Sequence, residues 1–220
     1  SDAIVQIPDG VVEIGYRAFY QNRTIERIEL PEGLAKIGLQ AFAGCTALQH
    51  ITFDQSLRFV GYDAFQDTAW HAAQPEGIVY TGPLAWRVKG DLRSLTEVSI
   101  RPGTVKLCAD LFRNCTALFA VNLPDTLTEI DDRAFQNCRK LKEIHIPEQV
   151  CRIGDRAFDE CTGLSIQLDS TDAVIGRQCF MSGTKIRVKQ LHPAKLPANV
   201  RDSAIIAFAD DVCAERVQNG

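Results

Sequence analysis

Phenylalanine recurs at a fixed interval in this chain. Six of the 11 phenylalanines follow an interval of 23 positions, in two groups: Phe19, Phe42 and Phe65, then Phe112, Phe135 and Phe158. Phe180 follows after 22 positions, and the longer gap of 47 positions separates the two groups. A period of roughly 20 to 50 residues is the signature of stacked structural repeats. The sequence therefore predicts a solenoid, in which each repeat packs on its neighbours.

The residues around each phenylalanine keep the same phase. A typical unit contains Ile37-Gly38, then Ala41-Phe42, then Cys45, and continues as an apolar alternation that ends in proline in several copies. The cysteine of this unit recurs at one repeat position: Cys45, Cys115, Cys138 and Cys161. Stacked, inward-facing thiols of this kind are expected to be buried as small hydrophobic groups and to remain reduced.

The pattern within one unit has a direct physical interpretation. Alternating apolar residues such as Ile144 and Ile146 predict a short strand with one buried face. Pro147 ends that strand, because proline has no N–H to donate to a sheet. Ala134 and Phe135 are expected on a short helical turn that closes the back of the coil. One unit alone cannot bury these side chains, whereas stacked units form a continuous core.

The repeated letters Ile-Gly, Ala-Phe, Cys and the apolar alternation resemble the bacterial BspA-like leucine-rich repeats over about residues 4 to 190. The resemblance implies a curved, right-handed coil with a parallel β-sheet on its concave face and short helical turns elsewhere. Residues 1–190 would form this solenoid. The resemblance also implies a bacterial cell-surface or secreted protein that acts in adhesion or host interaction.

The long gap between the phenylalanine groups holds an insert at about residues 70–90. Two strand-like segments flank the turn signal Thr81-Gly82-Pro83, which predicts a β-hairpin. The insert contains both tryptophans of the chain. Trp70, Tyr80 and Trp86 form either an exposed aromatic binding ridge or a packing layer that attaches the hairpin to the solenoid.

The two ends of the chain depart from the repeat. Residues from about 199 to 217 have the apolar spacing of an amphipathic helix, so we expect residues 191–220 to form a helical cap or the start of a further domain. At the other end, Val5-Gln6-Ile7-Pro8 aligns with the middle of the next unit. The sequence is therefore expected to continue upstream with further repeats in the native gene product.

The composition of the chain and the spacing of its reactive residues argue against several functions. A net charge of −4 gives no basic footprint for nucleic acid, and no apolar run approaches the roughly 20 residues that span a bilayer. His50 and His145 are several turns apart and cannot share a metal ion. No nucleophile–base pair, paired carboxylates or glycine-rich phosphate loop emerges, so we expect no enzyme, metal or cofactor.

The redox state of the off-register cysteines stays open: Cys108, Cys151, Cys179 and Cys213.

The outward residues of the predicted strands vary in chemistry while the core letters repeat, as expected of a face that binds a protein. This candidate binding face consists of Arg27, Glu29, His50, Thr52, Glu97, Ser99, Asn122, Glu143, His145, Gln167, Arg187 and Lys189. A merely solvated face would have the same pattern. The alternatives to a surface or secreted interaction module are an intracellular scaffold, for which a cytoplasmic location would fit, and the non-catalytic part of a larger enzyme.

Overall fold

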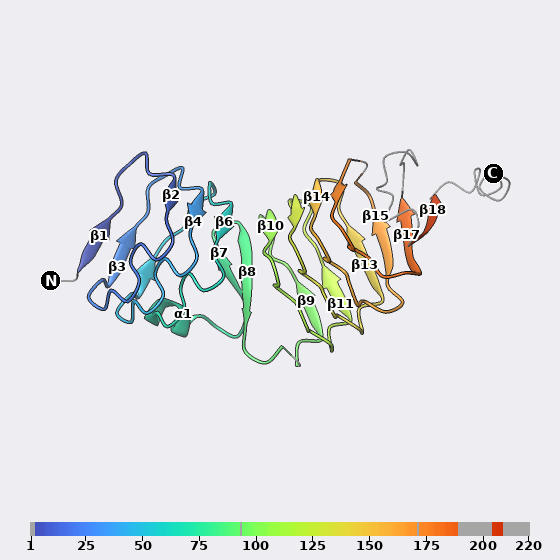
Figure 1. The fold of residues 1–220 in the computed structure, drawn as a ribbon, viewed down its shortest axis with the longest axis horizontal. Coiled ribbons are helices and arrows are strands. Elements are labelled where there is room, and N and C mark those ends of the chain that lie inside the picture. Colours follow the sequence, from blue (N-terminus) through green and yellow to red (C-terminus); the bar gives the residue numbers. More distant parts are fainter. Residues whose placement is uncertain (1–2, 93, 171, 189–203, 209–220) are drawn as a thin grey trace. The chain divides into compact units, whose positions relative to one another are not determined.

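The computed structural model describes residues 3–92, 94–170, 172–188 and 204–208, the last of these for the backbone alone. The chain divides into two compact units, Ser1–Lys89 and Gly90–Gly220. Within each unit, most repeats contribute a first strand and a short second strand, and the two kinds of strand pair in parallel in separate sheets (Figure 1). The predicted repeat solenoid with parallel sheets is thus confirmed.

The first unit contains two three-stranded sheets. The first strands are β1 (Ile4–Gln6), β3 (Arg27–Glu29) and β5 (His50–Ile51). The second strands are β2 (Glu13–Ile14), β4 (Lys36–Ile37) and β6 (Phe59–Val60). The insert then adds the helix α1 (Ala69–Ala73) and two antiparallel strands, β7 (Gly77–Thr81) and β8 (Leu84–Lys89), which confirm the predicted hairpin.

The second unit follows the same plan. Its first strands are β9 (Glu97–Ser99), β11 (Ala120–Asn122), β13 (Glu143–Ile146), β15 (Ser165–Leu168), β17 (Thr184–Val188) and β18 (Ala204–Phe208). Its second strands are β10 (Lys106–Leu107), β12 (Glu129–Ile130), β14 (Arg152–Ile153) and β16 (Val174–Ile175). Within the described ranges, no helix has the length and hydrophobicity needed to pass through a bilayer.

The register of the sheets follows the repeat. Ile28 pairs with Ile51 and Ile130 pairs with Ile153, so equivalent residues of successive units lie side by side. These central residues are buried, whereas their strand neighbours Arg27 and Glu129 are exposed and half-buried respectively. Alternation along each strand therefore separates a core face from an outward face, as a half-buried sheet requires.

The repeated phenylalanines stack along each unit. In the first unit the ring centroids of Phe19 and Phe42 are 5.1 Å apart, and those of Phe42 and Phe65 are 5.4 Å apart. In the second unit Phe135 lies between Phe112, at 5.2 Å, and Phe158, at 5.1 Å. Offset or parallel ring pairs at these separations add to the stabilisation from burial.

The expected helical turn at Ala134 and Phe135 is wrong. The backbone N–H of Phe135 donates to the carbonyl of Ala157 in the next repeat, at 2.8 Å, rather than to its own turn. Arg133 precedes this pair with a φ of 54°, which interrupts any right-handed helix. The segment is therefore a series of turns tied to the neighbouring repeat.

The expected C-terminal helix is also wrong where the structure describes it. Ala204–Phe208 form β18, which pairs in parallel with β17 through Ile186 and Ile206. The rest of the predicted helix, including residues 199–203 and 209–217, lies outside the described residues. A run such as Ile205-Ile206 is rich in β-branched residues, which favour a strand, and the sheet of β17 offers an edge to extend.

Glycine permits the close approach of successive repeats beside the second strands. A Cβ on Gly61 would lie 2.5 Å from the backbone N and Cα of Leu39, whereas a Cβ on Gly15 would meet no atom within 4 Å. We expect Gly61→Ala to lower the free energy of unfolding by about 1–3 kcal/mol through overpacking. Gly15→Ala is the matched control, and urea denaturation of both variants measures the difference. Equal stabilities would contradict this account of the repeat spacing.

Candidate functional site

The candidate binding face lies on the sheets formed by the first strands. In the first unit, Arg27 and Glu29 flank the buried Ile28 on β3, and His50 and Thr52 flank the buried Ile51 at β5. All four outward side chains are exposed. Arg27 pairs in register with His50, so the structure brings these two predicted residues side by side.

In the second unit the same alternation places seven of the predicted residues outward. They are exposed and lie on β9, β11, β13, β15 and β17: Glu97, Ser99, Asn122, Glu143, His145, Gln167 and Arg187. Lys189, the last predicted member of the face, lies outside the described residues. Register pairs bring Ser99 next to Asn122 and His145 next to Gln167.

Neighbouring outward residues are partly bonded to one another. The Asn122 side-chain amide donates to the Ser99 hydroxyl at 3.1 Å. His145 Nε2 lies 2.8 Å from a carboxylate oxygen of Asp169, and Gln167 Nε2 donates to the other oxygen at 3.1 Å. Sequence reasoning did not identify Asp169, which directly follows β15 and fixes two members of the face. Its carboxylate side chain gives the face an acidic acceptor beside an imidazole.

The aromatic ridge predicted on the hairpin is not present as an exposed surface. Trp70 and Trp86 are buried, and Tyr80 is half-buried. Trp86 Nε1 donates to the Gly61 carbonyl at 3.2 Å, and both tryptophan rings pack edge-on against Phe65, at 4.9 Å for Trp70 and 5.6 Å for Trp86. The structure agrees with the alternative in which the aromatic rings attach the insert to the solenoid, because these rings cover the last phenylalanine of the first unit.

The regular cysteines face the core as free thiols. Cys45, Cys115, Cys138 and Cys161 are all buried. The thiol of Cys138 donates to the Phe112 carbonyl at 3.2 Å, and that of Cys161 donates to the Phe135 carbonyl at 3.1 Å. Burial raises the pKa of Cys115 to about 12, so its thiol is protonated and a poor nucleophile at neutral pH.

The off-register cysteines divide by exposure. Cys108 and Cys179 are buried free thiols, and burial raises the pKa of Cys108 to about 12. Cys151 is free and exposed, and Cys213 lies outside the described residues. The described cysteines are therefore packing residues, with Cys151 as the accessible thiol among them.

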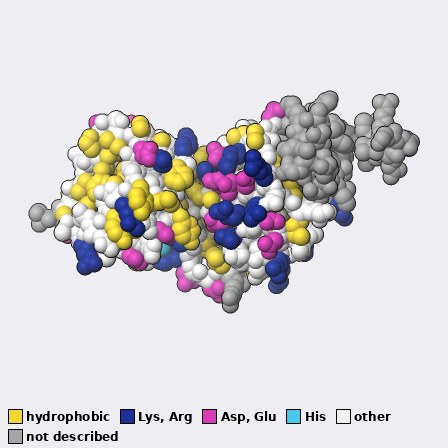
Figure 2. Space-filling model, in the orientation of Figure 1, with side chains coloured by type: hydrophobic (Ala, Val, Ile, Leu, Met, Phe, Trp, Pro, Cys, Tyr) yellow, Lys and Arg dark blue, Asp and Glu magenta, His cyan; other side chains and the backbone are white. Residues whose placement is uncertain are grey.

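Sequence reasoning missed the outward face of the second strands. In the second unit this face holds a charge cluster, in which the Lys106 ammonium lies 3.1 Å from Glu129 and 2.9 Å from Asp131. Arg152 bridges Asp131 at 2.8 Å and Asp132 at 3.1 Å. Figure 2 shows Lys, Arg, Asp and Glu side chains gathered on one face of the second unit.

The charge cluster is satisfied within itself. Burial alone would raise the pKa of the Asp131 carboxyl, but hydrogen bonds from Arg152 and Lys106 outweigh burial and hold that pKa below its usual range. Asp131 occupies the repeat position that Gly38 and Gly61 hold in the first unit, and a search for charges at that position would have found the cluster. A partner would have to compete with these internal ion pairs, so the cluster is a weaker candidate than the first-strand face.

Comparison with known proteins agrees with the repeat. The family model of the BspA type leucine rich repeat region matches residues 3–74 and 91–209, in six copies. The unmatched stretch between these ranges corresponds to the hairpin insert. Among curated proteins, none matches the chain.

Several solved structures are similar to parts of this chain. A leucine rich cell surface protein from Faecalibacterium prausnitzii A2-165 is 33% identical, with 76% of this chain and 39% of that chain covered and a TM-score of 0.36. A leucine-rich repeat protein from Eubacterium ventriosum ATCC 27560 is 16% identical, with 94% and 73% covered and a TM-score of 0.47. The T. pallidum leucine rich repeat protein is 26% identical, with 91% and 80% covered and a TM-score of 0.35.

The chain thus spans 39% of the length of the Faecalibacterium protein. The family model, by contrast, covers most of this chain, on both sides of the insert. The matched residues include the stacked phenylalanines and the paired first and second strands of both units. The chain belongs to the BspA-type leucine-rich repeat family.

Proposed function

We propose that this chain is a non-catalytic protein-interaction module of a bacterial surface or secreted protein, and that the first-strand face binds the partner. The observation that carries the proposal is the alternation on the first strands. Every described member of the candidate binding face is exposed, and the residues between them are buried. Packing of the repeats therefore explains the residues that are buried. The outward residues are not needed for that packing and are available to contact a partner.

The chemistry of this face suits a protein partner. Each unit presents both signs of charge on this face: Arg27 and Glu29 in the first unit, and Arg187, Glu97 and Glu143 in the second. A polyanion such as nucleic acid would favour a uniformly basic face. The amide and hydroxyl groups of Asn122 and Ser99 add donors and acceptors at the same level of the sheet. Such a mixture gives specificity through hydrogen bonds and charge complementarity.

A charge-reversal variant tests the face. Arg27→Glu, Glu97→Lys and Glu143→Lys together change exposed side chains, so each is expected to alter the free energy of unfolding by at most about 0.5 kcal/mol. The matched control carries Arg23→Glu, Glu32→Lys and Glu148→Lys, which make the same change in charge at exposed positions off the face. Thermal unfolding by circular dichroism compares the two variants with the unchanged chain.

Binding of the two variants is measured on an array of purified extracellular proteins. A partner bound by the unchanged chain is expected to be lost by the face variant and retained by the control variant. Retention by both variants would place the binding surface elsewhere on the molecule. Loss by both would show that net charge alone determines the interaction.

A second candidate is an intracellular scaffold, and the thiols favour it. The described cysteines are free, and Cys151 is also exposed, which suits a reducing compartment. Protease treatment of intact cells separates the two candidates. A surface module is degraded before the cells are lysed, whereas an intracellular scaffold is degraded only afterwards.

A further inference from the structure

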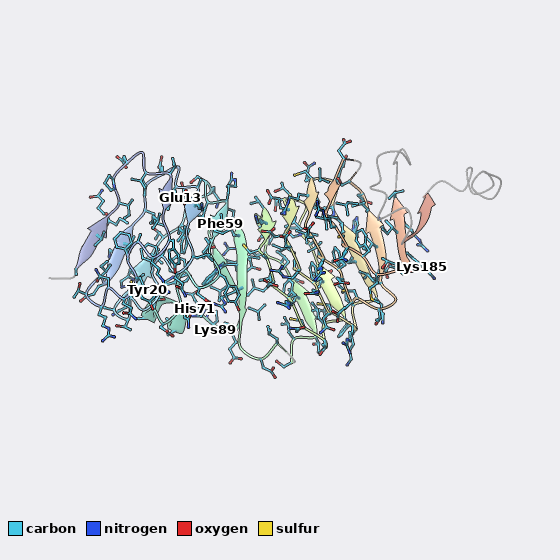
Figure 3. The ribbon with its side chains drawn as sticks, viewed as in Figure 1. Glu13, Tyr20, Phe59, His71, Lys89 and Lys185 are labelled. Atoms are coloured by element: carbon cyan, nitrogen blue, oxygen red, sulfur yellow. The ribbon has the colours of Figure 1, made fainter. Side chains whose placement is uncertain are left out.

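Just after each second strand of the first unit, an apolar side chain is exposed. Tyr16, Leu39 and Tyr62 occupy one repeat position on successive turns, and they are 63%, 49% and 56% exposed. We call these three residues the tyrosine row. Phe59 and Tyr20 are exposed beside it. Figure 2 shows the hydrophobic side chains gathered on the first unit, and Figure 3 labels Phe59 and Tyr20 there.

The repeat itself does not require aromatic residues at this position. The equivalent residues of the second unit are small or polar: Ala109, Asp132, Asp155 and Arg177. Those turns form the same paired strands without the rings. The exposed rings of the first unit are therefore not needed to complete its turns. Contiguous exposed apolar residues of this kind are a feature of interaction sites.

The row is held closely together by the backbone. Gly38 and Gly61 allow successive turns to approach, and the N–H of Arg17 donates to the carbonyl of Leu39 at 3.2 Å. Parallel strands lie about 4.8 Å apart, so the tyrosine row covers about 10 Å across its three turns. An extended peptide covers that distance with three to four residues, at about 3.3 Å each.

Cationic side chains lie over the rings of this surface. The guanidinium of Arg17 is 5.0 Å from the Tyr16 ring centroid and 4.5 Å from that of Tyr20. The guanidinium of Arg87 is 4.8 Å from the Tyr62 ring, and the ammonium of Lys36 is 5.8 Å from the Phe59 ring. Stacking on the rings fixes these cations in place before a partner binds, which lowers the entropy cost of binding.

The surface carries an excess of positive charge, although the whole chain has a net charge of −4. Three cations lie over its rings or those beside it: Arg17, Lys36 and Arg87. The two carboxylates among them are already engaged, Glu13 with Lys36 at 2.8 Å and Asp63 with Arg87 at 3.5 Å.

The guanidinium of Arg17 has donors left for a partner. Its Nε donates to the Gln40 side-chain oxygen at 2.7 Å, and its terminal nitrogens donate to no acceptor in the described part of the chain. A carboxylate can accept from those nitrogens through charge-assisted hydrogen bonds.

We propose that the tyrosine row binds an extended acidic peptide segment of a partner protein, with apolar side chains of that segment packed on Tyr16, Leu39 and Tyr62. Its carboxylates pair with the terminal nitrogens of Arg17. Tyrosine and arginine are among the residues enriched in binding hot spots. The guanidinium groups over the rings of Tyr16 and Tyr62 favour a partner with carboxylates over a neutral sugar. This surface is separate from the first-strand face and is tested separately.

The test is a fluorescence-anisotropy titration of the whole chain with two labelled peptides. One alternates glutamate with phenylalanine, and its charge-inverted counterpart alternates lysine with phenylalanine. We expect the acidic peptide to bind and the basic peptide to fail. Added sodium chloride should weaken the binding, because exposed charges are screened at higher ionic strength.

Point variants locate the binding. Arg17→Glu and Tyr62→Ala are each expected to weaken the acidic peptide by about tenfold or more, as the loss of a charged or aromatic hot spot does. Arg23→Glu and Phe119→Ala are the matched controls, since both residues are exposed and lie off the row. These controls are expected to bind as the unchanged chain does.

Four results would overturn the proposal. The first is equal binding of both peptides, and the second is unchanged binding by the Arg17 and Tyr62 variants. The third is self-association in analytical ultracentrifugation that Tyr62→Ala abolishes, which would make the row an interface between two copies. The fourth is binding to a neutral oligosaccharide array that needs Tyr62 while the acidic peptide does not bind. A negative result in these titrations does not affect the first-strand charge reversal, because the two experiments change different residues.

Discussion

Phe135→Ala is expected to lower the free energy of unfolding by about 3–5 kcal/mol, the range for removing a fully buried phenylalanine side chain. The Phe135 ring is fully buried between the rings of Phe112 and Phe158, at 5.2 and 5.1 Å. Removal leaves a cavity, and it also deprives two neighbouring rings of their contact. The effect therefore reaches both adjacent repeats.

Urea denaturation followed by circular dichroism measures this loss. Hydrogen exchange adds a spatial test, because repeat proteins are stabilised by interactions between nearest neighbours. Amides of β12 and β14 are expected to exchange faster in Phe135→Ala, while those of β3 and β4 exchange at the original rate. Phe119→Ala provides the control, since Phe119 is 53% exposed and its loss is expected to cost at most about 0.5 kcal/mol. A similar stability for the two variants would contradict the repeat register.

The fold could be predicted from the interval of the phenylalanines because stacking preserves phase. Equivalent residues such as Phe135 and Phe158 must lie side by side when every turn has the same length, and the structure stacks them. The hairpin was also predictable, since Gly82-Pro83 between two apolar segments is a local signal. Both features depend on information that lies close together in the sequence or recurs at a constant distance.

The second strands could not be predicted in the same way. Glu129–Ile130 is a strand of two residues, too short to show alternation. At Phe135 the sequence predicts a short helical turn, but the partner of its backbone N–H, the carbonyl of Ala157, belongs to the next repeat. Likewise, Ala204–Phe208 has spacing that suits either a helix or a strand, and the neighbouring β17 decides between them. In each case a contact distant in sequence determines the local structure.

The first-strand face and the tyrosine row differ in how well the sequence reveals them. Strand alternation identifies outward residues such as Glu97 and Glu143 directly, and both are exposed in the structure. Tyr16 and Tyr62 occupy the same repeat position, which the sequence interval shows. Their exposure depends on the second strands, which the sequence does not reveal. Trp86 shows the converse error, because an aromatic residue in an insert can be buried as easily as exposed.

Trp86→Ala is expected to lower the free energy of unfolding by about 3–5 kcal/mol, as large as the effect at Phe135. Trp86 is 3% exposed, and its ring packs edge-on against Phe65 at 5.6 Å and His71 at 5.8 Å. Its loss also removes the hydrogen bond from Nε1 to the Gly61 carbonyl. The end of the phenylalanine stack in the first unit would lose one of the two tryptophans that cover it.

Trp86→Phe separates the two contributions of Trp86. The phenylalanine ring retains much of the apolar contact but has no N–H, so the further loss on going to alanine reports packing alone. Losing the hydrogen bond is expected to cost about 0.5–1.5 kcal/mol, plus the smaller ring volume. Urea denaturation gives the stabilities, and hydrogen exchange of the β7 and β8 amides shows whether the hairpin opens first. If Trp86→Ala unfolds at the original urea concentration, the hairpin does not contribute to the core, and the exposed aromatic ridge becomes the better description of the insert.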